Sequence, residues 1–299
     1  MANKLVDIRT AAESIQDGNT VGFGGFSVTR SVIALAHELI RVGRKDLTAS
    51  VQIAGLEVDL LAGAGALKKV IYSAGSLDRF GSLATMNRLI YEEKIETEEY
   101  SGLSMLLRYW AGAIGVSYAP CNSLLGTDIL KFLLEKYPDN VKLTNCPFTG
   151  EKQVLVKALK PDVGIVGVNY CDEEGNAVIF GPTWDNKEML HASKRVIVVT
   201  EKIVSKEYLS RQPELTTIPG AIVDMVVEVP FFAYPTALFR NYDYDAAHLA
   251  MYVKAAKSEE TMKAYIDEYI LGVKDHFEYL DKFGSRATLA RIARSDKGY

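Results

Sequence analysis

The chain has 299 residues, 48% of them hydrophobic, which is enough for one large α/β domain. A formal net charge of −4 and an isoelectric point near 5.7 argue against a general nucleic-acid-binding protein, whose affinity depends on basic surface. We expect a soluble cytoplasmic protein without a membrane segment, because the sequence has no apolar signal core and no apolar run long enough to cross a bilayer.

The first half of the chain alternates predicted helices and strands. Apolar residues at helical spacing predict helices over 7–16, 29–41, 55–65, 82–93, 103–114 and 129–136. Short β-branched runs predict strands that begin at Thr20 and span 47–53, 69–73 and 116–119. Asp128 is placed to cap the helix over 129–136.

The second half is richer in predicted strands, which span 141–145, 153–158, 163–168, 177–180, 195–200 and 221–229. A helix is predicted over 184–192, and 248–294 is predicted to be helical throughout. The alternation predicts an open, largely parallel α/β sheet covered on both faces. We expect a single domain, 1–299, with a core of about 1–240 and a helical extension of about 241–299. That extension either docks a partner subunit or covers the sheet.

Three glycines stand in four positions within the segment Gly22–Phe26 at the end of the first strand. Strand, Gly-rich turn and helix together aim backbone N–H groups into one space, where they can hold an anion or a transient oxyanion. A plain tight turn explains the same pattern. A dinucleotide-binding turn fits poorly, because Ser27 stands where its third Gly or Ala belongs. No Gly-Lys-Ser/Thr of a phosphate-binding loop follows.

The sequence offers no obvious attacking group. The spacing of its histidines and cysteines matches no known metal site, so no metal site is expected. These residues are His37, His191, His248, His276, Cys121, Cys146 and Cys171. No carboxylate stands in a strand-end setting that would raise its pKa. The acidic run over 95–100 is expected to be a solvated face. An oxyanion-holding turn without an attacker indicates a site completed by another polypeptide.

The Gly22–Phe26 segment, with Arg30 opening the next helix, resembles the first loop of the A (α) subunits of class I coenzyme A transferases, and the chain is most similar to the glutaconate CoA-transferase type. The resemblance extends over almost the whole chain. Further similar motifs follow in order: Tyr72–Ser76, Glu98–Ser101, Gly126–Asp128, Asn145–Phe148, Ile218–Gly220, Val223–Asp224, Tyr242–Asp245, Lys274–His276 and Tyr279–Leu280.

This resemblance implies the open α/β fold shared by sugar isomerases and CoA transferases. It also implies a hetero-tetramer or hetero-octamer with a B subunit, whose glutamate attacks the thioester of an acyl-CoA. Coenzyme A would then be a substrate, with no cofactor bound permanently. The backbone N–H groups of Gly24, Gly25 and Phe26 would hold the oxyanion.

Side chains that would contact the substrate acid follow from the same resemblance; they are Ser27, Arg30, Ser73, Ser76, Thr127 and Tyr234. A dicarboxylic acid would need such a donor or cation at its far end. Tyr234 lies in Phe232–Pro235, where close relatives tend to have Gly-Ala-His-Pro, so the acyl pocket is expected to differ.

Three functions stay open. The first is the A (α) chain of a CoA-transferase acting on a short or medium carboxylic acid. The second is a ring-cleaving CoA-ester hydrolase or an acyl-CoA decarboxylase on the same scaffold, in which Glu98 or Glu99 would be the base. The third is a non-catalytic sensor that binds a small phosphorylated ligand by itself.

Overall fold

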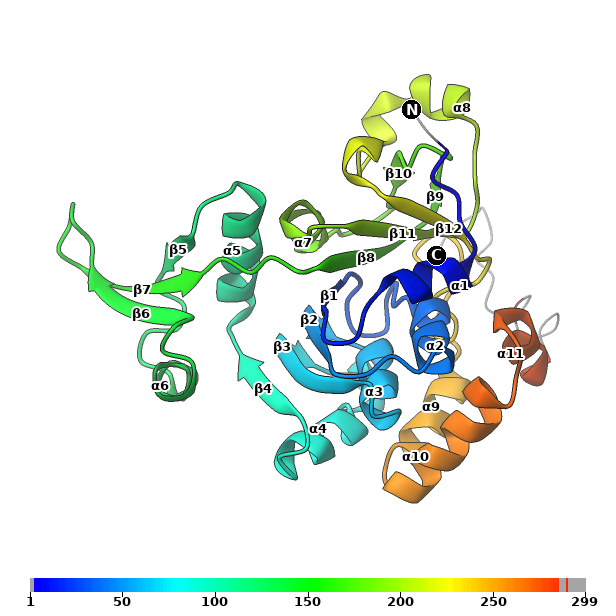
Figure 1. Ribbon diagram of the computed structural model, residues 1–299, viewed down its shortest axis with the longest axis horizontal. Helices are drawn as coiled ribbons and strands as arrows, with labels where there is room; N and C mark the ends of the chain where they lie inside the picture. Colours follow the sequence, from blue (N-terminus) through cyan, green and yellow to red (C-terminus); the bar gives the residue numbers. More distant parts are fainter. Residues whose placement is uncertain (1–2, 285–288, 290–299) are drawn as a thin grey trace.

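Within the part of the chain that the structure describes, a seven-stranded parallel sheet runs through the middle of the molecule (Figure 1). This computed structural model describes residues 3–284 and Leu289. The strands, in spatial order, are β12 (Met225–Glu228), β11 (Val196–Thr200), β8 (Val163–Val168), β1 (Thr20–Phe23), β2 (Leu47–Ala54), β3 (Leu67–Gly75) and β4 (Glu96–Glu99). All neighbouring pairs are parallel, so the predicted open parallel α/β sheet is confirmed.

The order of the strands reverses at β1. The chain builds β2, β3 and β4 on one side of β1, and later adds β8, β11 and β12 on the other side. The connections that leave the carboxyl ends of β1 and β8 therefore diverge, and open α/β sheets bind their ligands at such a point. The Gly-rich segment follows β1 directly and lies at this position.

Helices cover both faces of the sheet (Figure 1). One face carries α1 (Ile8–Ser14), α2 (Ile33–Arg41), α3 (Leu56–Gly63) and α4 (Ala84–Tyr91), and the other carries α5 (Gly102–Ala113) and α7 (Asn186–Ala192). Strand β8 contributes Val163 and Ile165 to the first hydrophobic core and Val166 and Val168 to the second. A strand buried on both faces explains its uninterrupted apolar sequence.

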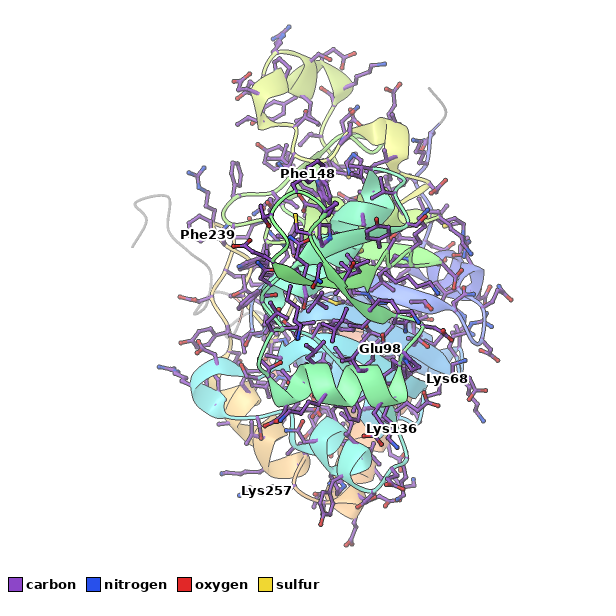
Figure 2. The ribbon with its side chains drawn as sticks, turned by 90° about the vertical axis from the view of Figure 1, so that its left-hand side faces the viewer. Lys68, Glu98, Lys136, Phe148, Phe239 and Lys257 are labelled. Atoms are coloured by element: carbon purple, nitrogen blue, oxygen red, sulfur yellow. The ribbon has the colours of Figure 1, made fainter. Side chains whose placement is uncertain are left out.

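A second, three-stranded antiparallel sheet projects from the first (Figure 1). It consists of β5 (Tyr118–Cys121), β7 (Lys152–Lys157) and β6 (Val141–Asn145), and α6 (Asp128–Lys136) packs beside it. The strands predicted here exist, but they lie outside the main sheet: β6 buries only Val141, and β7 buries only Val154 and Val156, as expected for a sheet with one face toward solvent. Figure 2 views the molecule from this side and labels Phe148, which is 94% exposed between β6 and β7.

Shorter elements complete the described chain. They are a hairpin of β9 (Tyr170–Cys171) and β10 (Ala177–Val178), the helix α8 (Lys206–Ser210), and 3₁₀ turns at Asp78–Phe80, Pro213–Leu215 and Gly220–Ile222.

Two predicted helix starts are wrong. The helix predicted from residue 29 begins at Ile33, because Ser27 and Arg30 have positive φ values of 54° and 60°, which a right-handed helix excludes. The Gly-rich segment therefore does not run straight into a helix. In α6 the cap is Thr127, whose hydroxyl accepts from the Leu130 N–H at 3.2 Å, and not the predicted Asp128.

The C-terminal region is helical but not continuous. It consists of α9 (Ala246–Ala255), α10 (Glu259–Ile266), a π-helical turn (Asp267–Leu271) and α11 (His276–Lys282). Ser258 and Asp275 cap α10 and α11, and each cap starts a new helix. The Tyr252 hydroxyl donates to Asp59 Oδ2 at 2.7 Å, so this region covers α3. The end of the predicted helix, apart from Leu289, lies outside the described residues.

A buried ion pair ties β4 to its neighbours. The side chain of Glu98 is 1% exposed; its carboxylate lies 2.8 Å from Lys69 Nζ and 3.2 Å from Arg108 Nη1. Tyr100 and Asn140 also donate to Glu98, at 2.5 and 2.9 Å. Burial alone would raise the pKa of Glu98, but Arg108 and Lys69 overcome that effect and hold the pKa below its usual value. The prediction that this acidic run is a solvated face is therefore wrong at Glu98.

Replacing Glu98 tests this ion pair. We expect Glu98→Gln to lower the free energy of unfolding by about 3–5 kcal/mol, because it leaves the buried Arg108 without a counter-charge. The matched control is Glu96→Gln on the same strand. Its side chain is 70% exposed and 4.0 Å from Lys69, and its loss should cost at most about 1 kcal/mol. Urea unfolding measures both, and equal losses would contradict the role assigned to Glu98.

Candidate active site

The loop after β1, residues 24–32 (the Gly loop), is held by hydrogen bonds within itself and to distant parts of the chain. Gly24 N–H donates to Ile165 O at 2.8 Å, Phe26 N–H to Thr29 O at 2.9 Å, and Gly25 N–H to Asn186 Oδ1 at 3.0 Å. All three predicted oxyanion donors thus already have acceptors inside the chain. The prediction that Gly24, Gly25 and Phe26 offer free N–H groups is therefore wrong for this loop.

Three backbone donors of the Gly loop are left over, because the N–H groups of Val28, Ser31 and Val32 have no acceptor among the residues that the structure describes. From residue 24 to residue 30, only the Val28 N–H has no acceptor among the residues that the structure describes. The Val28 carbonyl accepts from Ala237 N–H at 2.8 Å, and Arg30 N–H donates to Ala237 O at 2.7 Å. These two hydrogen bonds connect the segment after β12 to residues 28–30 of the Gly loop.

The Gly loop contains unusual backbone conformations. Gly25 has φ +106°, and a Cβ built on it would lie 2.7 Å from the Arg30 carbonyl oxygen. Ser27 and Arg30 are left-handed although neither is glycine. Such conformations persist only when the surroundings enforce them, and they are frequent at functional sites. The steric conflict also means that a side chain at position 25 would disturb folding.

Three predicted substrate contacts lie at the carboxyl ends of β1 and β3, the two strands that flank β2. Ser27 Oγ donates to the Ser76 carbonyl at 2.9 Å and lies 3.4 Å from Ser76 Oγ. Ser73, near the end of β3, donates to Gln52 O at 2.5 Å from the neighbouring strand β2. The fold brings Ser27 and Ser76 into contact and places Ser73 close to the same edge of the sheet.

Arg30 is turned into the protein. It is 2% exposed, and its Nη2 donates to Asn186 Oδ1 at 2.9 Å and to Pro182 O at 3.2 Å. The guanidinium carbon lies 5.1 Å from the centre of the Trp184 ring. Burial lowers the pKa of Arg30 to about 10. The prediction that Arg30 contacts the substrate acid therefore finds no support in this geometry.

Two further predicted contacts lie elsewhere. Tyr234 is fully buried, and its hydroxyl donates to Asp245 Oδ2 at 2.9 Å beneath the C-terminal helices. Thr127 caps α6, a helix that lies beside the small sheet and well apart from β1 in Figure 1. Neither side chain has a hydrogen bond to the Gly loop among the described residues, and their contact with the substrate acid stays a prediction.

Sequence reasoning missed three carboxyl groups near the carboxyl edge of the sheet. Burial raises the pKa of Glu57, Asp185 and Glu201 to about 7 each. Glu57 comes three residues after β2 ends and Glu201 directly follows β11, so strand-end position was the available signal. The prediction that no strand-end carboxylate has a raised pKa is wrong.

These carboxyl groups face inward. Glu201 accepts from the Phe231 N–H at 2.7 Å and from the Tyr242 hydroxyl at 2.6 Å. A Cβ built on Gly55 would lie 2.8 Å from Glu57 Oε2, next to the backbone of the Gly loop. This Glu57 oxygen has no hydrogen-bond partner among the described residues. Glu57 and Glu201 are therefore buried groups of this chain and not exposed nucleophiles.

The two alternative bases differ. Glu98 has a lowered pKa and is committed to its ion pair, which makes it a poor base. Glu99 is half-buried at the end of β4, and burial raises its pKa. Of the two, Glu99 has the environment that a general base requires.

Comparison with known proteins identifies the family. The profile of the Coenzyme A transferase family matches residues 6–229, and the chain belongs to this family. It is 33% identical to the A chain of the 3-oxoadipate CoA-transferase of Pseudomonas knackmussii, over 93% of this chain and 98% of that protein. It is 31% identical to the A chain of the glutaconate CoA-transferase of Acidaminococcus fermentans, over 95% and 92%.

The fold agrees with a solved structure from the same group. The crystal structure of the Acidaminococcus fermentans glutaconate CoA-transferase superposes with a TM-score of 0.93, covering 99% of this chain and 97% of that one. The expected family and the expected A (α) type within it are thereby confirmed. An uncharacterized relative from Archaeoglobus fulgidus is 34% identical, and this chain spans 66% of its length.

Other relatives are named for different reactions. A cholesterol ring-cleaving hydrolase subunit of Rhodococcus jostii is 27% identical, over 92% of this chain and 95% of that protein. The structure of a decarboxylase, AibA/AibB, superposes with a TM-score of 0.78 at 27% identity, over 89% and 100%. Across the described residues, no helix has the length and apolar character needed to span a bilayer.

The steric argument for Gly25 gives a stability prediction. We expect Gly18→Ala, at φ +79° with open space around it, to cost about 1–2 kcal/mol for the left-handed backbone alone. Gly25→Ala should cost roughly 1–3 kcal/mol more, because its Cβ also meets the Arg30 carbonyl. Denaturant unfolding of the two variants compares them, and equal losses would mean that the loop relaxes freely around position 25.

The buried carboxyl of Glu57 predicts a pH dependence. Its pKa rises from 4.5 to about 7 on folding, so the stability it contributes is fully present below pH 4.5 and is lost as the pH rises through 7. Glu57→Gln stays neutral, so it should gain up to about 3 kcal/mol relative to wild type between pH 4.5 and 8. Urea unfolding across this range measures the difference. The exposed Glu207→Gln is the control and should show no such trend.

Proposed function

We propose that this chain is the A (α) chain of a heteromeric CoA-transferase that moves CoA between an acyl-CoA and a free carboxylic acid. The observation that carries the proposal is the position of the Gly loop at the strand-order reversal of a fold that matches glutaconate CoA-transferase over nearly its full length. The raised-pKa carboxyl groups of this chain are buried, which supports the proposal that a B subunit supplies the nucleophilic glutamate.

The chemistry divides one transfer into easier steps. The glutamate carboxylate that the B subunit supplies attacks the thioester carbonyl, and CoA leaves as thiolate while an acyl anhydride forms. The thiolate then attacks the glutamyl carbonyl, which releases the donor acid and leaves CoA joined to the glutamate as a thioester. The acceptor acid then runs both steps in reverse: its carboxylate attacks the glutamyl-CoA thioester and forms a new anhydride, and the released thiolate attacks the acyl carbonyl of that anhydride. This gives the new acyl-CoA and frees the glutamate.

Each step passes through a tetrahedral intermediate with a negative oxygen, which needs preorganised donors. Within residues 24–30, the Val28 N–H is the backbone donor that remains unused among the described residues, so we assign the oxyanion contact to it in place of the glycine N–H groups. Ser27, Ser73 and Ser76 offer hydroxyl groups at the same edge of the sheet for the acid.

The relatives favour a dicarboxylic acid. Two of them are named for glutaconate and for 3-oxoadipate, both of which carry a second carboxylate. Hydroxyl donors on neighbouring strands suit a carboxylate that must be held without being buried as an isolated charge. On this proposal the working enzyme is a hetero-tetramer or hetero-octamer in which the two kinds of chain share the site.

A second candidate is a CoA-ester hydrolase or acyl-CoA decarboxylase on the same scaffold. It is favoured by Glu99, whose pKa is raised by burial at the carboxyl end of β4. In that case this chain would supply the base, and the partner would need no nucleophilic glutamate. Glu99→Gln would then abolish turnover, whereas a transferase with its nucleophile in the B subunit should keep most of it.

Borohydride trapping tests the transferase proposal. The chain is purified together with its B subunit, and the pair is screened with acyl-CoA donors against a panel of mono- and dicarboxylic acids. We expect borohydride to inactivate the pair only when acyl-CoA is present, because it reduces the thioester between glutamate and CoA. An active pair that resists borohydride under these conditions would contradict covalent transfer.

A further inference from the structure

Asn186 connects the Gly loop to the first residue of α7. It is 1% exposed, and its side-chain oxygen accepts from the Gly25 N–H at 3.0 Å and from Arg30 Nη2 at 2.9 Å. Its Nδ2 donates to Asp185 Oδ1 at 3.2 Å. One buried amide therefore holds two points of the Gly loop that are five residues apart.

An aromatic contact strengthens the same connection. The rings of Phe26 and Trp184 are stacked, with centroids 4.7 Å apart and an interplanar angle of 19°. The Arg30 guanidinium lies over Trp184. Trp184 has φ 46°, so it joins Ser27 and Arg30 as a third non-glycine residue in the left-handed region. Two of these residues, Arg30 and Trp184, lie against each other beside Asn186, and Ser27 lies between the two points of the Gly loop that Asn186 holds.

The energetics make Asn186 the central member of this cluster. Without its oxygen, a buried N–H and a buried guanidinium would each lose an acceptor, and unpaired buried donors are costly. Arg30 Nε already has no partner among the described residues, so little remains to hold the guanidinium. Relaxation of Ser27 and Arg30 out of the left-handed region is the expected response.

We propose that Asn186 is a positioning residue for CoA transfer. It is too buried to touch a substrate, but it sets the conformation of residues 24–30 and therefore the direction of the Val28 N–H and of the Ser27 hydroxyl. The consequence for turnover rests on the proposed function. The consequence for loop conformation does not, and it is measured separately.

The kinetic test uses three variants of this chain in complex with the B subunit. Asn186→Leu removes the acceptor at similar size, and Asn186→Asp keeps an acceptor oxygen for both donors. Asn169→Leu is the matched control, because Asn169 is also a buried amide, 2% exposed, that bonds Phe180, Phe239 and Asn241 but not the Gly loop. We expect Asn186→Leu to lower kcat roughly a hundredfold, as for a small misplacement of reacting groups, while Asn186→Asp recovers most of it.

A spectroscopic test reports the loop without any substrate. The chain contains two tryptophans, so Trp110→Phe leaves Trp184 as the single emitter. In that background we expect Asn186→Leu to increase acrylamide quenching of Trp184 and shift its emission, because the stack on Phe26 loosens. Asn169→Leu should leave both signals as in the parent.

Each outcome decides the proposal. A lower kcat and greater quenching with Asn186→Leu, but not with Asn169→Leu, support it. Unchanged Trp184 quenching, or an equal fall of kcat in the control, overturns it. If the wild-type pair transfers no CoA to any acid, the proposed function fails, and the quenching data still decide the role of Asn186. Should Asn186→Leu not fold, Asn186→Ser replaces it, since a short hydroxyl cannot reach both donors.

Discussion

The close approach of α7 to the sheet is the constraint on which the candidate site depends. Gly22 on β1 and Gly164 on β8 are paired neighbours, and Cβ atoms built on them would lie 2.6 and 3.1 Å from the sulfur of Met189. Met189 can occupy this space only because both positions lack side chains. That packing brings the start of α7 to the carboxyl end of β1, where Asn186 reaches the Gly loop.

Burial of polar groups gives the site its rigidity. The backbone N–H groups of residues 24–30 are all paired except that of Val28, and most of their acceptors belong to other parts of the chain. Near the same edge of the sheet, the pKa values of Glu57, Asp185 and Glu201 are raised to about 7, because burial and not a counter-charge dominates their environment. Buried polar contacts of this kind are stable when every member is paired, which suits a loop that holds the Val28 N–H in one direction.

The family relationship and the geometry agree on what this chain contributes to the proposed site. This chain supplies a preformed loop at the edge of a parallel sheet, and its own acidic groups near that loop face inward. The proposed function assigns the attacking carboxylate to a second polypeptide for this reason. The buried Glu98 of β4 pairs with Lys69 of β3 and with Arg108 of α5, and Arg108 Nε also donates to Lys157 O on β7 at 3.0 Å, which ties the projecting sheet to the main sheet.

The sequence by itself determined the fold class, the family and the place of the Gly loop. These follow from local patterns: uninterrupted apolar strands, helical periodicity, and glycines directly after β1. It also indicated Ser27, Ser73 and Ser76, which lie at the carboxyl ends of β1 and β3, on either side of β2. Tertiary structure alone decided which N–H groups are free, because Asn186 and Ile165 are far from Gly24 and Gly25 in the chain. It likewise turned Arg30 and Tyr234 inward, since burial and partners across long sequence separations cannot be inferred from residue type.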